Sequence, residues 1–189
     1  GTTPAALLLA FMTATAILSF IVSNTATTLI MIPIGVAVLH AAGVREGDAE
    51  GFPGALAMGI AFSASIGGLG TLVGSPTNAI AAGIIERATG LQIDFLTWAI
   101  YGLPLVLVSI PLCWLILLKV QHVRPQDFDG EAARAGIGEM GPWSTAEKRL
   151  VPLVAAVVVA CVLLPLLSPF LPDDALTDGT VAIFGALLL

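Results

Sequence analysis

Charged residues are scarce in this chain of 189 residues, and long stretches lack them entirely. Asp, Glu, Lys and Arg make up 11% of the sequence, whereas soluble domains carry about 25%. The uncharged stretches are 44, 34, 24 and 23 residues long, at 1–44, 52–85, 95–118 and 150–172. About 20 apolar residues suffice to cross a bilayer as a helix. The sequence therefore predicts an all-α membrane protein with several spans, and it excludes soluble enzymes and nucleic-acid binding.

Cysteine and intramembrane charge are also nearly absent. Cys113 and Cys161 both lie in apolar stretches, where we expect small core residues without a redox or metal role. The two histidines lie outside the apolar cores, His40 at a helix end and His122 in a loop. Proton relays in membranes need intramembrane Asp, Glu or His, so this part of the protein favours sodium coupling or simple exchange. An intramembrane hydrolase would need a base beside a hydroxyl such as Ser75, and the surrounding sequence has none.

The first uncharged stretch, at 5–40, is too long for one span and has a polar centre. Ser23-Asn24-Thr25 separates an apolar arm at 7–22 from another at 29–39. A three-residue tip is too short to leave the membrane, so we predict a re-entrant helical hairpin; two full spans with a tight turn remain the alternative. Backbone at membrane depth is tolerated only where protein or a water-filled cavity covers it. The tip therefore indicates a site.

The second stretch, at 52–85, is interrupted by glycine and proline, and the helical segment that contains it extends over 52–88. We predict helices at 52–66 and 79–85 with a break at 67–78, where the sequence holds four glycines and one proline. Continuing a helix through this composition would be costly, because Gly and Pro are the two poorest helix formers. The prediction is a broken transmembrane helix. A helix-packing pair formed by Gly70 and Gly74 is the alternative.

The remaining segments predict further spans and their orientation. We expect an ordinary span at 95–118, kinked by its prolines, then a polar connector at 119–149 that includes a possible amphipathic helix at 127–135. Spans follow at 150–172 and from about Asp178. Because six of the seven Lys and Arg residues fall in 41–51 and 119–149, these loops are predicted to be cytoplasmic in a multi-pass plasma-membrane protein. The chain starts without Met and stops inside an apolar run, so we expect a piece of a longer protein.

The two breaks expose helix ends of opposite polarity. Helix ends leave about four backbone groups unpaired, carbonyls at the C-terminus and amides at the N-terminus. Carbonyls near 19–23 and 66–70 suit a cation, whereas amides near 24–26 and 78–79 suit an anion. Ser19 and Ser23 are four residues apart, so the spacing predicts two hydroxyls on one helix face, as hard oxygen ligands for Na⁺.

Two motifs resemble one transporter family. Ser23-Asn24-Thr25-Ala26-Thr27 and Gly74-Ser75-Pro76-Thr77-Asn78 are similar to segments of the divalent anion/sodium symporters, the dicarboxylate, citrate and sulfate carriers. The likeness covers the whole chain, including Gly141-Pro142-Trp143 and Asp178-Gly179-Thr180-Val181. It implies one half of an inverted-repeat, elevator-type homodimer that dimerises through its scaffold. Residues 1–118 would belong to the transport domain and 150–189 to truncated scaffold spans, joined by the connector at 119–149.

The resemblance also implies which residues bind ligands. The first sodium site would consist of oxygen ligands from Ser19, Ser23, Asn24 and the carbonyl of Gly74. The anion ligands would lie at the two amide ends, at Asn24, Thr25, Ser75 and Pro76. Supporting positions would be Gly67, Gly68, Gly70, Thr71 and Asn78. The family commonly has Pro where this chain has Thr77, a departure that bears on selectivity.

The expected function is secondary active transport that couples Na⁺ to movement of a small divalent anion, with a C4-dicarboxylate as first choice. Na⁺ is the coupling ion, and no organic cofactor or enzymatic activity is expected. An anion exchanger or a sulfate or citrate carrier of the same fold is the alternative, and a channel or an intramembrane hydrolase fits less well.

Overall fold

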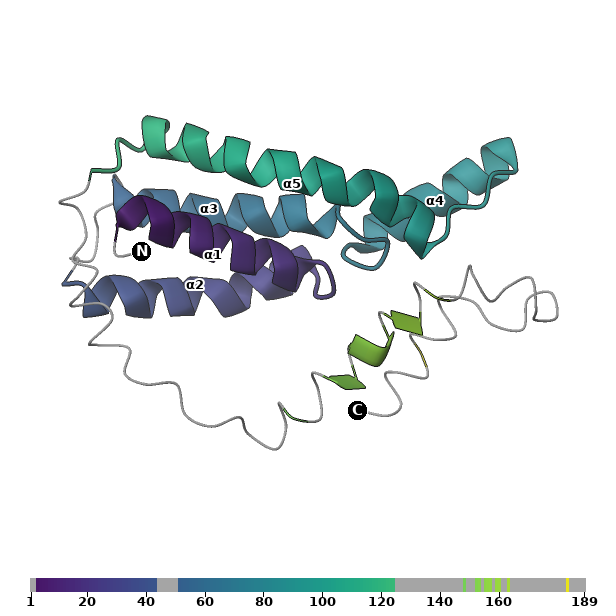
Figure 1. Ribbon diagram of the computed structural model, residues 1–189, viewed down its shortest axis with the longest axis horizontal. Coiled ribbons are helices and arrows are strands. Elements are labelled where there is room, and N and C mark those ends of the chain that lie inside the picture. Colours follow the sequence, from purple (N-terminus) through teal and green to yellow (C-terminus); the bar gives the residue numbers. More distant parts are fainter. Residues whose placement is uncertain are drawn as a thin grey trace.

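The computed structural model describes residues 3–43 and 51–124, together with a few single positions beyond 124. This part is helical, as predicted for an all-α membrane protein (Figure 1). Within 3–43 and 51–124, five helices follow one another: α1 (Pro4–Ser19), α2 (Asn24–Ala41), α3 (Phe52–Gly68), α4 (Pro76–Thr89) and α5 (Phe95–Val120). The connector predicted at 119–149 lies outside the described residues from 125 on, apart from Lys148, and so do the helix at 127–135 and most of the predicted spans beyond it.

Local chemistry fixes where these helices begin. Pro4 and Pro76 occupy the first helical position, where the missing N–H is no loss. The Thr3 hydroxyl accepts from the Ala6 amide at 3.3 Å, and the Asp94 carboxylate accepts from the Thr97 amide at 2.7 Å. These side chains cap two helix starts whose amides have no partner within the helix.

Two of the described helices are long and apolar enough to cross a membrane, namely α2 with 18 residues and α5 with 26. α1 and α3 are shorter apolar helices of 16 and 17 residues. At 1.5 Å per residue, α1 is about 24 Å long, less than the hydrocarbon core of about 30 Å. α5 remains helical through Pro104 and Pro111, the two residues expected to kink it.

α1, α2, α3 and α5 lie alongside one another, whereas α4 projects beyond this bundle (Figure 1). The core lies mainly between α1 and α3, and its fully buried residues include Leu8, Met12, Phe52, Leu56 and Ile60. The starts of α1 and α3 and the ends of α2 and α5 lie at one end of the bundle (Figure 1). The hairpin tip and the α3–α4 loop therefore meet at the opposite end.

Glycines allow the backbones of α1 and α3 to touch. A Cβ on Gly67 would lie 2.5 Å from the Ala16 carbonyl oxygen and 2.6 Å from its Cα. A Cβ on Gly59 would lie 2.9 Å from a methyl of Leu8. Because backbone atoms cannot move aside as a side chain can, the contact at Gly67 is the more stringent of the two.

The break in the second helix is shorter than predicted. The sequence indicated a break at 67–78, but α3 continues through Gly68 and α4 begins at Pro76, which leaves the loop 69–75. Gly67 and Gly68 remain helical because they pack against α1 and the Asn24 side chain, where a larger residue would not fit. Pro76 starts a helix instead of ending one, as expected at a first helical position.

We expect Gly67→Ala to lower the free energy of unfolding of the purified protein by about 1–3 kcal/mol, because the new methyl group overpacks a backbone contact. Gly83→Ala is the matched control, since a Cβ there meets no atom within 4 Å inside α4. That variant should gain about 0.5–1 kcal/mol from helix propensity. Equal unfolding temperatures for the two variants would contradict the role given to Gly67.

Candidate functional site

The hairpin tip at 20–23 and the loop at 69–75 are in direct contact. A Cβ on Gly68 would collide with the amide oxygen of Asn24. A Cβ on Gly74 would lie 2.8 Å from the carbonyl oxygens of both Ser19 and Gly68. The end of α1, the start of α2 and the end of α3 therefore converge on one place, to which the loop adds Gly74.

Ser19 lies at the centre of this convergence and is fully buried. Its hydroxyl donates to the Ala64 carbonyl at 2.6 Å and lies 3.1 Å from the amide oxygen of Asn24. One hydroxyl proton serves the shorter bond best, so the Asn24 oxygen is only weakly held. That oxygen remains available to a further ligand.

Ser23 does not share a helix face with Ser19, contrary to the expectation from their spacing. α1 ends at Ser19, and Ser23 is the N-cap of α2 after the turn. The exposed Ser23 hydroxyl accepts from the Ala26 amide at 3.5 Å, a long and therefore weak capping bond. Thr25, two residues further on, is also exposed. The i, i+4 argument failed because it assumed one continuous helix through the tip.

Thr71 and Asn78 join the loop to the tip and to α3. The Thr71 hydroxyl donates to the Phe20 carbonyl and accepts from the Gly74 amide at 3.0 Å. The Asn78 amide group donates to the Gly68 carbonyl at 2.7 Å and to the Thr71 carbonyl at 2.8 Å. Asn78 is 3% exposed, so these bonds form out of contact with solvent or lipid. Both residues thus bind the backbone that surrounds the contact.

Most carbonyls that the sequence suggested as free at the end of α3 have partners. The carbonyls of Ile66 and Gly67 accept from the amides of Leu69 and Gly70, and that of Leu69 accepts from the Trp98 indole. With the Asn78 bond to Gly68, four of the carbonyls at 66–70 are occupied. The correction follows from tight turns and side-chain donors that a propensity argument does not include.

The carbonyls of Ser19 and Gly74 are among those at this place that remain open, since no hydrogen bond reaches them from the described residues. The Ser19 carbonyl and hydroxyl and the Asn24 amide oxygen make a set of neutral oxygen atoms at the contact, and the Gly74 backbone lies against this set. Hard cations such as Na⁺ prefer oxygen ligands of this kind. In the described ranges, no group of three His, Cys, Asp or Glu side chains offers an alternative metal site.

The starts of α2 and α4 supply the amide ends. Ser75 caps α4 by position, but no side chain hydrogen-bonds to the first amides of this helix. The Ser75 hydroxyl instead pairs with that of Thr77 at 2.8 Å, on the exposed side of the loop. Pro76 is exposed and has no N–H to donate. The Asn78 backbone amide donates to the Ser75 carbonyl at 3.0 Å, so the Thr77 amide is the donor that the positive end of α4 offers to an anion.

The sequence did not indicate the part played by α5. Trp98 donates its indole N–H to the Leu69 carbonyl at 2.9 Å, and Gly102 packs against the same peptide. A tryptophan near a span end is ordinarily an interfacial anchor. The only signal was a small residue one turn after Trp98, on the same helix face.

Comparison with known proteins places the chain in a family. A family model described as "Citrate transporter" (CitMHS) matches residues 1–189. The chain belongs to the citrate transporter family. The predicted resemblance to the dicarboxylate, citrate and sulfate carriers is thereby confirmed, and membership indicates a membrane transporter rather than an enzyme.

Relatives of this citrate transporter family chain include two staphylococcal proteins named sodium-dependent dicarboxylate transporter SdcS. The protein of Staphylococcus saprophyticus is 34% identical over 201 residues, and that of Staphylococcus aureus is 34% identical over 203 residues. Each alignment covers 100% of the chain and 38% of the relative. The chain thus spans less than half the length of these relatives.

Proposed function

We propose that the protein containing this chain is a secondary transporter that couples Na⁺ to the movement of a small divalent anion, with a C4-dicarboxylate as first substrate. One observation carries the proposal. Two breaks in apolar helices lie in contact, where neutral oxygens from one helix end adjoin the amide ends of two others. The names of the staphylococcal relatives support both the ion and the substrate class.

The cation would bind among four residues. The Ser19 and Asn24 side chains already adjoin each other, and the Gly74 backbone lies against Ser19. Ser23 would join them by rotating its hydroxyl out of the weak 3.5 Å cap. Gly67, Gly68 and Gly70 support this site by letting backbone and side chains approach where a Cβ would collide. Thr71 and Asn78 support it by fixing the loop.

The anion would bind where the cation and the amide ends meet. Asn24 and Thr25 begin α2, and Ser75 and Pro76 begin α4, so both positive helix ends lie beside the site. The described helices hold no buried cationic side chain to attract the anion, so a bound Na⁺ would supply the missing positive charge. Each ligand then raises the affinity of the other by the same factor. Asn24, assigned to both ligands, connects them.

The larger architecture is part of the same proposal. Residues 1–118 form a transport domain in one of two inverted repeats, and 150–189 belong to a scaffold through which the protein dimerises. α1, at about 24 Å, is too short for the full hydrocarbon core, which supports a re-entrant tip. The loops at 41–51 and 119–149 are cytoplasmic by their Lys and Arg content. The second candidate is an anion exchanger or a sulfate or citrate carrier of the same fold, and the family description supports citrate as its substrate.

The complete protein in proteoliposomes should take up succinate faster with an inward Na⁺ gradient than with the same gradient of K⁺. Citrate and sulfate, tested in parallel, decide among the carriers of this fold. An anion exchanger would instead require internal anion and ignore the Na⁺ gradient. Uptake that rises linearly without saturation would indicate a channel and contradict the proposal.

Ser19→Ala should raise the Na⁺ concentration for half-maximal uptake by at least about 10-fold, because a buried oxygen near the charged ligand is lost. Ser65→Ala is the matched control on α3, since that exposed hydroxyl bonds only to the Ala61 carbonyl of its own helix. It should stay within about twofold of the parent. An unchanged Na⁺ dependence in Ser19→Ala would exclude Ser19 as a ligand.

Thr25→Val keeps the side-chain shape but removes the hydroxyl, whereas Thr25→Ser keeps the hydroxyl. Losing one hydrogen bond to a charged group costs about 1.5–3 kcal/mol, so the Val variant should bind the anion about 10- to 150-fold more weakly. The Ser variant should remain near the parent. Na⁺ binding without anion should survive Thr25→Val and fail in Asn24→Ala. Loss of Na⁺ binding in both variants would refute this division of roles.

A further inference from the structure

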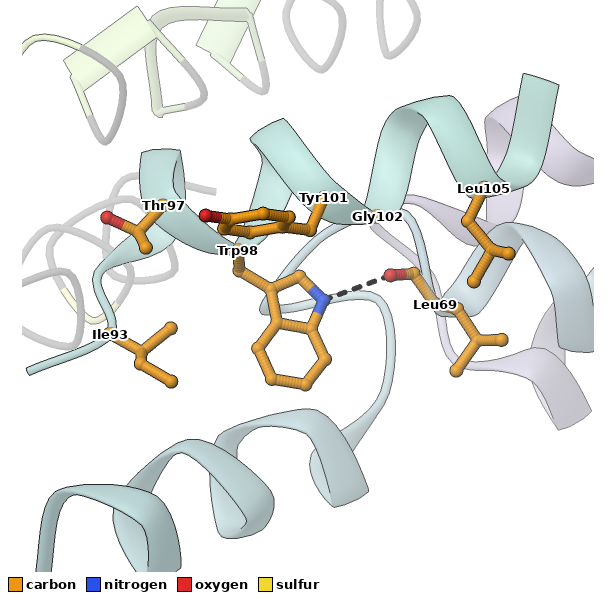
Figure 2. A pocket seen from close by; sticks show the side chains of 7 residues that line it. All are labelled: Leu69, Ile93, Thr97, Trp98, Tyr101, Gly102 and Leu105. Carbon is orange, nitrogen blue, oxygen red and sulfur yellow. Dashed lines mark hydrogen bonds between the residues drawn. The ribbon is translucent and has the colours of Figure 1, made fainter. Parts of the chain in front are cut away.

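Near its start, α5 contacts the loop that follows α3 at the peptide between Leu69 and Gly70. The Trp98 indole donates to the Leu69 carbonyl at 2.9 Å (Figure 2). One turn later, a Cβ on Gly102 would lie 2.6 Å from the same oxygen and 2.9 Å from that of Gly70. The peptide is therefore held against α5 by a side-chain donor and by a close backbone contact.

A cavity of about 290 Å³ lies beside this contact. Its walls are mainly apolar and include Ile93, Tyr101 and Leu105, with the Trp98 ring projecting between them (Figure 2). The cavity leaves one side of the ring without close neighbours. Packing alone therefore does not fix the ring, and its bond to Leu69 does.

The held peptide is adjacent in sequence to the residues that build the site. Gly68, directly before it, packs against the Asn24 amide. Gly70 packs against the Phe20 ring, where a Cβ would lie 2.6 Å from a ring carbon. Thr71, directly after it, bonds to the Phe20 carbonyl and the Gly74 amide. A shift of the peptide would thus move Gly68 and Gly74 relative to Ser19 and Asn24.

We propose that Trp98 and Gly102 are positioning residues for the cation site, acting through the Leu69–Gly70 peptide. The inference rests on the proposed function. Neither residue contacts the candidate ligands: Trp98 occupies the Leu69 carbonyl, and Gly102 provides the space that lets this peptide lie against α5. Together they set the distance between the Gly74 backbone and the hairpin tip.

The matched control is another tryptophan on the same helix. The Trp114 indole donates to the Ala5 carbonyl at 2.8 Å, at the opposite end of the bundle from the site. Trp98→Phe and Trp114→Phe each remove one indole-to-carbonyl bond and keep an aromatic ring. The two variants differ in the carbonyl that loses its donor, which is Leu69 in the loop 69–75 for Trp98→Phe and Ala5 in α1 for Trp114→Phe. Gly102→Ala displaces the same peptide through the other contact, without changing an indole.

The complete protein should show a rise of about 3- to 10-fold in the Na⁺ concentration for half-maximal succinate uptake in Trp98→Phe, as expected for losing one backbone-directed bond. Gly102→Ala should shift it at least as far. At saturating Na⁺, succinate affinity should stay within about twofold in both. Trp114→Phe should leave both constants within about twofold. NaCl should raise the melting temperature of the detergent-solubilised protein relative to choline chloride. This rise should be smaller in Trp98→Phe and Gly102→Ala than in Trp114→Phe, and measuring it requires no transport assay.

Two outcomes separate this inference from the proposed function. A parent protein whose uptake and thermal stability ignore Na⁺ would contradict the proposed function, and the inference with it. A Na⁺-dependent parent in which Trp98→Phe behaves like Trp114→Phe would overturn the inference alone. Equal losses of Na⁺ and succinate affinity at saturating co-ligand would also overturn it, because they would indicate general damage. Should Trp98→Phe fail to fold, the Na⁺ dependence of Gly102→Ala decides.

Discussion

Contact between the end of α3 and the hairpin is the constraint on which the described structure depends. At Gly67 the Ala16 backbone takes the place of a side chain, and at Gly68 the Asn24 amide does. Each helical glycine costs about 0.5–1 kcal/mol relative to alanine, so the sequence forgoes helix stability to bring these backbones together. With a side chain at either position, the end of α3 would move away from the hairpin, and Gly74 would no longer lie against Ser19.

Close contact between these backbones buries their polar groups, some of which have hydrogen-bond partners and some of which do not. Buried carbonyls need donors, and the molecule supplies Asn78 and Trp98 as side-chain donors at the end of α3. The hydroxyl of Thr71 does the same for the tip. In the described ranges, the Ser19 carbonyl has no donor and the Asn24 amide oxygen has only the long bond from the Ser19 hydroxyl. Because donors occupy most of the competing carbonyls at the end of α3, a cation would be favoured at the hairpin tip.

The sequence predicted the helices and the two polar interruptions, because these follow from composition and local propensity. The family could also be named from the Ser23-Asn24-Thr25 and Gly74–Asn78 segments. Contacts between residues distant in the sequence could not be predicted from it. Gly67 looked like a helix breaker because its partner, Ala16, lies 51 positions earlier and is not evident from local pattern. The role of Trp98 was not indicated because its acceptor, the Leu69 carbonyl, lies 29 positions earlier at another helix end.

α5 binds both the hairpin and the loop of the broken helix. Its two indoles bind carbonyls at opposite ends of the bundle, Ala5 at the start of α1 and Leu69 after the end of α3. A helix attached at both ends resists sliding of the hairpin past the broken helix, since either displacement breaks an indole bond. In the proposed transport domain, ligands held between tip and loop would then move with an intact site. α4, which projects from the bundle (Figure 1), is attached mainly through Asn78 at its start. The positive end of α4 is thus anchored to the site.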